Sequence, residues 1–135
     1  MRNEENIWLV PENDKEIDDF LSLIGNSEEY SKISIYYKEL KELLILDYIQ
    51  IGYKGEYEEV LGFLKLNGYR FSVENFKPVI TLDNKYFKSF FKYLTKDKKL
   101  KRDSIITFYY SKNKHIVFVE VENKIGVIAI CVEVI

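Results

Sequence analysis

The chain has 135 residues, of which 47% are hydrophobic and 31% are charged, and its formal net charge is −2. This composition excludes a disordered chain and is typical of one globular domain, which we expect to span residues 1–135. With a single cysteine, Cys131, and a single histidine, His115, the chain cannot assemble an internal disulfide or the usual zinc ligand sets. We therefore expect a cytoplasmic protein that has no metal or other cofactor.

Charge is distributed unevenly along the chain. Residues 1–60 contain 15 acidic and 6 basic residues, whereas residues 61–114 contain 4 acidic and 13 basic residues. The two segments thus carry charges of −9 and +9, an asymmetry that indicates a charged partner. The longest uncharged apolar run, residues 125–132, is far shorter than the roughly 20 residues of a membrane-spanning helix, so we expect no membrane partner.

The first third of the chain shows a short apolar run followed by helical spacing. Residues 7–10 end at Pro11 and are typical of a strand. A helix is predicted from the N-cap Asn13 to Gly25, with an apolar face made of Ile17, Phe20, Leu21 and Ile24. A second helix is predicted to begin at Ser27 and to continue to Leu44, although residues 33–37 also fit a strand.

The middle of the chain gives mixed signals. Residues 45–53 alternate between apolar and polar positions and lie between glycines, which favours a strand. Residues 57–67 have apolar residues at helical spacing and end at Asn67-Gly68, which predicts a helix. Residues 69–82 fit a helix start in their first half and a strand in their second half, and the sequence leaves the two alternatives open.

The clearest predicted helix covers residues 84–99 and is capped by Asp83. One face carries the apolar residues Phe87, Phe90, Phe91 and Leu94. The other face carries the lysines Lys85, Lys88, Lys92, Lys96 and Lys99. Three strand-like segments follow, at residues 104–110, 115–121 and 125–134, and the short polar turns between them predict an antiparallel meander.

These elements predict an α+β fold. We expect the helices mainly in residues 13–100 and a three-stranded antiparallel meander at the C-terminal end. Strands near residues 7–10 and 45–53 are candidates to extend the meander.

Residues 56–121 resemble a winged-helix domain in their spacing. The predicted helix ending near Asn67, a second helix from Ser72 and the lysine-rich helix 84–99 correspond to the three helices, and residues 104–121 correspond to the wing. The resemblance implies that the lysine-rich helix binds nucleic acid. Pro78 and the absence of glycine before Asp83 depart from the family pattern.

No motif of the sequence indicates an enzyme. His115 has no G-x-S-x-G or other nucleophile motif near it, and Cys131 lies in an apolar segment without a basic neighbour. The acidic residues follow no calcium-binding spacing and accompany no phosphate-binding loop. We therefore expect a non-enzymatic protein.

The function that these features favour is a small binding protein of the immunity or inhibitor type. Its acidic surface would dock on another protein with a basic surface, because dense carboxylates complement such a surface and accelerate encounter. The predicted binding residues are Asp14, Glu16, Asp18, Asp19, Glu28 and Glu29. The alternative is a nucleic-acid-binding module that uses Lys85, Lys88, Lys92, Lys96 and Lys99. A second copy of the chain is a further candidate partner.

Overall fold

The computed structural model describes residues 7–26, 29–54, 60–66, 69–70, 76–111 and 115–129. Within these residues the chain forms three helices: α1 (Asp14–Gly25), α2 (Tyr37–Leu43) and α3 (Asn84–Leu94). It also forms nine strands: β1 (Trp8–Leu9), β2 (Ser31–Tyr36), β3 (Tyr48–Lys54), β4 (Val60–Leu66), β5 (Tyr69–Arg70), β6 (Phe76–Asp83), β7 (Ile105–Ser111), β8 (Ile116–Val121) and β9 (Lys124–Ala129).

The strands form two antiparallel sheets. The larger sheet has the order β1-β9-β8-β7-β2, and the smaller sheet has the order β5-β4-β3-β6. The predicted α+β class and the C-terminal meander, β7-β8-β9, are confirmed, and residues 130–134 of the predicted last strand lie outside the described residues. β1 extends the meander as expected by pairing with β9. β3, by contrast, belongs to the smaller sheet, and β2 occupies the other edge of the larger one.

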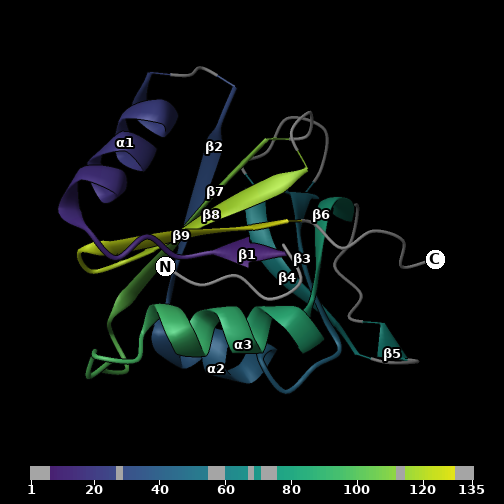
Figure 1. Cartoon of the computed structure of the whole chain (residues 1–135). Helices are drawn as coiled ribbons and strands as arrows, with labels where there is room; N and C mark the ends of the chain where they lie inside the picture. The colour runs from purple at the N-terminus through teal and green to yellow at the C-terminus, as the bar shows by residue number, and fades with distance from the viewer. Residues whose placement is uncertain are drawn as a thin grey trace.

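Helix α1 covers one face of the five-stranded sheet, and helices α2 and α3 cover the opposite face (Figure 1). Side chains alternate between the two faces along β8. Phe118 packs in a small cluster with residues of α1, whereas Val117 and Val119 belong to the main core together with residues of α2 and α3. The main core also contains Ile49 of β3 and other residues of the smaller sheet. The acidic helix α1 and the lysine-bearing helix α3 are therefore separated by the sheet.

Helices α1 and α3, which have clear N-cap residues in the sequence, begin where the sequence predicts. The Asn13 side chain accepts a hydrogen bond from the backbone N–H of Glu16 at 2.8 Å, and the Asp83 side chain accepts one from Lys85 at 2.8 Å. Asn84, buried at the start of α3, donates from its amide to the carbonyl oxygens of Leu43 and Leu46 at 2.9 and 2.7 Å. These bonds fix the start of α3 against the end of α2.

The predicted helix from Ser27 to Leu44 is wrong for its first half. Residues 31–36 form β2, as the alternative strand interpretation of residues 33–37 expected, and only residues 37–43 are helical. Residues 27–28 lie outside the described residues. The β-branched residues Ile33 and Ile35 favour a strand, and β2 pairs with β7 about seventy positions later in the chain.

The predicted helix 57–67 is also wrong, because residues 60–66 form β4, which pairs with β3 and β5. A short apolar run fits a helix and a buried strand equally well when its pairing partner is unknown. The open alternatives for residues 69–82 resolve to strands at 69–70 and 76–83, and residues 71–75 lie outside the described residues. Pro78 is accommodated because β6 is an edge strand with an irregular register at that point.

These strands overturn two expectations about the lysine-rich region. Strands β4 and β6 lie where a winged-helix domain would have its first two helices, so the fold does not match that resemblance. The lysine-rich helix ends at Leu94 rather than at residue 99. Lys96 and Lys99 therefore follow the helix and are not part of it.

Candidate protein-docking surface

The N-terminal cap of α1 engages one carboxylate of the helix and leaves others exposed. Asn13 also donates from its amide nitrogen to the Glu16 carboxylate at 2.6 Å, so both residues are bonded to each other at the start of the helix. Glu16 is thereby part of the cap. Asp14 and Asp18 are exposed and four residues apart, a spacing that places their side chains on one side of the helix.

A hollow of about 410 Å³ lies between α1 and the β8–β9 hairpin. Two of its carboxylates come from α1 and two from the hairpin, about a hundred positions later in the chain. The rest of its lining consists of three apolar residues, one lysine and one asparagine. We call this site the acidic hollow; it is lined by Asp14, Ile17, Asp18, Leu21, Glu120, Glu122, Asn123, Lys124 and Ile125.

Glu120 is held in place by a tyrosine of the neighbouring strand. The hydroxyl of Tyr109 in β7 donates a hydrogen bond to the Glu120 carboxylate at 2.8 Å. Burial, followed by the hydrogen bond and the negative charge of Glu120, raises the pKa of Tyr109 to about 12. The tyrosine hydroxyl consequently keeps its proton at neutral pH and remains a donor to this carboxylate.

Glu122 occupies an unusual backbone position in the turn between β8 and β9. Its φ angle is 54°, in the left-handed region that residues other than glycine, asparagine and aspartate seldom adopt. Its exposed carboxylate forms an ion pair with the half-buried Lys98 at 3.8 Å. The turn holds this charge at the rim of the acidic hollow.

The structure brings together only part of the predicted acidic site. Asp14 and Asp18 line the acidic hollow, whereas Asp19 and Glu29 are exposed but do not line it. Glu16 is engaged in the cap of α1, and Glu28 lies outside the described residues.

Sequence reasoning missed Glu120 and Glu122, which contribute half of the carboxylates in the hollow. The available signal was their place in the hairpin. Phe118 and Glu120 are two residues apart in β8 and therefore lie on the same face of the sheet. That face is the one that α1 covers.

Three lysines form a row on the exposed side of α3. We call Lys85, Lys88 and Lys92 the cationic row; each is exposed, and none forms an ion pair with a described carboxylate. Lys96, beyond the helix, is paired instead with Glu12 at 3.4 Å and lies 4.2 Å from the centre of the Tyr93 ring. Lys99 is exposed. The predicted lysine stripe therefore contributes three of its five members to the helix surface.

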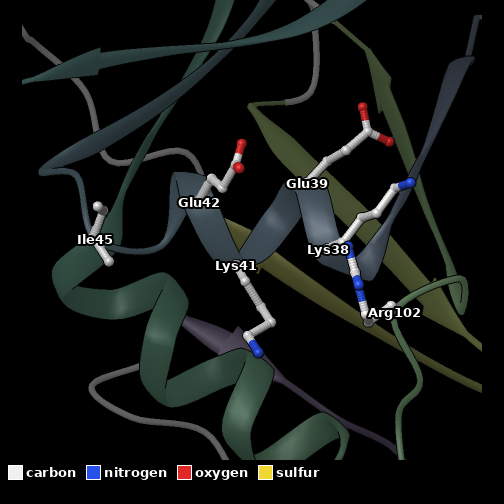
Figure 2. Close-up of a pocket in the computed structure, with 6 residues that line it drawn as sticks. All are labelled: Lys38, Glu39, Lys41, Glu42, Ile45 and Arg102. Carbon is white, nitrogen blue, oxygen red and sulfur yellow. The ribbon is translucent and has the colours of Figure 1, made fainter.

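A second hollow, of about 490 Å³, lies over the outer face of α2 (Figure 2). Its charged lining is mixed. The carboxylates of Glu39 and Glu42 point to one side of the helix and the ammonium group of Lys41 points to the other (Figure 2). Its complete lining is Lys38, Glu39, Lys41, Glu42, Ile45 and Arg102. Three basic and two acidic side chains line this hollow, so it lacks the excess of carboxylates that the acidic hollow has.

Metal-binding clusters and membrane-spanning helices are absent from the described part of the chain. It contains no group of three or more His, Cys, Asp or Glu side chains placed to hold a metal ion. None of its three helices combines the length and apolarity that crossing a membrane requires. Comparisons of the chain with protein-family models, curated proteins and solved structures find no match.

Proposed function

We propose that this chain is a small non-enzymatic binding protein of the immunity or inhibitor type, which docks its acidic hollow on a basic macromolecular partner, most simply another protein. The observation that carries the proposal is the convergence of four carboxylates from α1 and the β8–β9 hairpin around one hollow. Lys124 supplies the one ammonium group in its lining. The hollow therefore keeps a net negative charge, although Lys124 and the ion pair between Lys98 and Glu122 offset part of it.

The hollow suits the side chains of a basic protein in two ways. Its carboxylates attract lysine and arginine from a distance and so accelerate encounter. Its half-buried apolar residues, Ile17 and Leu21, offer contact to the aliphatic stems of the same side chains. The Tyr109 hydrogen bond to Glu120 orients one carboxylate before the partner arrives, which reduces the entropy lost on binding.

The partner can be identified with a tagged copy of the full chain, captured with its partners from the native cell with and without nuclease treatment. We expect a protein to be retained after nuclease treatment. Loss of all partners on nuclease treatment would contradict the proposal.

The site itself can be tested on the captured partner with two variants of equal charge change. The double variant Asp14→Asn/Asp18→Asn alters the acidic hollow, whereas Asp19→Asn/Glu29→Gln alters exposed carboxylates outside it. We expect the first variant alone to lower the association rate, and the loss to shrink as salt screens the charges. Equal losses in both variants would show that net charge, and not the hollow, determines binding.

The cationic row supports a second candidate function, the binding of nucleic acid. Lys85, Lys88 and Lys92 recur every three or four residues and have no carboxylate partner among the described residues, so phosphates can approach them. Under this function Lys88→Gln/Lys92→Gln weakens binding to duplex or single-stranded DNA, and Lys32→Gln/Lys101→Gln, at exposed positions outside the row, does not. No binding by the unaltered chain at about 50 mM salt would exclude this function.

A further inference from the structure

We propose that copies of this chain associate head to tail, with the cationic row of one copy seated on the acidic hollow of the next. The inference rests on the two charged surfaces of the chain and requires no other partner, although it uses the same acidic hollow as the proposed function.

The first support is the placement of the two surfaces. α1 packs on the face of the larger sheet that carries Phe118 and Ile125, and α3 packs on the opposite face (Figure 1). The negative and positive surfaces therefore lie on opposite sides of one molecule and cannot neutralise each other within it. A second copy presents the missing opposite charge on either side.

The second support is the match between the charged side chains. Asp14 and Asp18 on α1 are four residues apart, as are Lys88 and Lys92 on α3, and this spacing corresponds to about 6 Å along a helix axis. None of these four side chains forms an ion pair with a described residue. Two aspartates of one copy can therefore meet two lysines of the next without first breaking an internal ion pair.

The arrangement determines the kind of assembly. A contact between two different surfaces is heterologous, and when the surfaces lie on opposite sides of the molecule, the assembly does not close at two copies. Its size therefore grows with concentration. Because the contact is dominated by exposed charges, it weakens as salt screens them. Within the assembly each acidic hollow except the terminal one is covered.

Sedimentation equilibrium of the full chain tests the proposal at about 0.05 M and about 1 M salt. At low salt the average mass is expected to exceed 16.1 kDa and to increase with protein concentration. At high salt the average mass is expected to return to that of one chain. A single-chain mass at low salt and every concentration would overturn the proposal.

Two complementary variants make the test specific. Asp14→Asn/Asp18→Asn removes the acidic surface, and Lys88→Gln/Lys92→Gln removes the cationic one. Each variant alone is expected to remain a single chain at low salt. An equimolar mixture is expected to form a pair and nothing larger, because each variant retains one of the two surfaces. Neutral replacements are used because reversed charges would create a second complementary pair in the mixture.

The controls are the two double variants outside both surfaces, Asp19→Asn/Glu29→Gln and Lys32→Gln/Lys101→Gln, which are expected to associate as the unaltered chain does. A mixture of the complementary variants that stays at the mass of one chain would overturn the proposal. So would association that the two surface variants leave intact. These outcomes are distinguishable from failure of the proposed function, because sedimentation of the chain alone measures self-association in the absence of any other partner.

Discussion

Gly126 of β9 lies directly against the ring of Phe90 of α3. A β-carbon at position 126 would come within 2.6 Å of Cε1 of that ring and within 3.0 Å of Cγ2 of Val10. Phe90 is fully buried, so its ring has no solvent-filled space into which to move. The lack of a side chain at position 126 therefore determines how closely α3 approaches the sheet.

The Gly126→Ala variant is consequently expected to be less stable. The added methyl group must displace Phe90 or Val10 in a packed core, which costs about 1–3 kcal/mol of the free energy of unfolding. Gly25→Ala is the matched control, because a β-carbon there meets no atom within 4 Å and the added methyl group displaces nothing. Chemical denaturation of both variants measures the difference. An unchanged stability of Gly126→Ala would contradict the close approach.

Removal of the Phe90 ring is expected to have a larger effect. The ring contacts Trp8 and Phe87, each at a centroid distance of 5.9 Å, and a Phe90→Ala variant leaves a cavity between them. We expect a loss of about 3–5 kcal/mol in the free energy of unfolding. Lys88→Ala, on the exposed side of the same helix, is expected to change it by less than about 0.5 kcal/mol. Similar losses in the two variants would contradict the orientation of α3.

Helices α1 and α3 were predictable because their signals are local. Asn13 and Asp83 cap the helices, and apolar residues follow at helical spacing, so no distant partner is needed to assign them. The helical spacing of residues 57–67 is misleading, because residues 60–66 form β4 and pair with the neighbouring strands β3 and β5. For residues 33–37 the sequence leaves helix and strand both open, because the strand conformation of β2 depends on pairing with the distant strand β7. β2 lies about seventy positions before β7, and short apolar runs do not reveal such pairing.

The same distinction applies to the acidic hollow. Asp14 and Asp18 were predicted because both lie on one amphipathic helix, which can be assigned from its own residues. Glu120 and Glu122 reach the site only through the packing of α1 on Phe118 and Ile125. That packing joins segments about a hundred positions apart, so charge counts along the chain could not find these two residues.

The backbone of Glu122 leads to a prediction about the turn. Asparagine adopts the left-handed conformation more readily than glutamate, so Glu122→Asn is expected to relieve backbone strain. The ion pair with Lys98 lies at the surface, with Glu122 exposed and Lys98 half-buried, and contributes less than about 1 kcal/mol. We expect stability to be unchanged or to increase by up to about 1 kcal/mol, measured by chemical denaturation. Glu122→Val, which also removes the charge but is β-branched, is expected to be destabilised. Equal stabilities of the two variants would contradict the strained geometry.

The contact between Glu12 and Tyr93 gives a prediction about pH. A hydrogen bond from the Tyr93 hydroxyl is the largest cause that lowers the pKa of Glu12 from 4.5 to about 2. Because this pKa is lower in the folded chain, the ionised Glu12 carboxylate stabilises the fold above about pH 4.5. This stabilisation is lost as the pH falls towards about 2. Carboxyl NMR titration of Tyr93→Phe is expected to show the pKa of Glu12 closer to its ordinary value, and the acid-induced loss of stability in that window is expected to be smaller. Tyr48→Phe, which leaves this contact intact, is the control. A pKa of Glu12 that is unchanged by Tyr93→Phe would show that the hydroxyl does not stabilise the carboxylate.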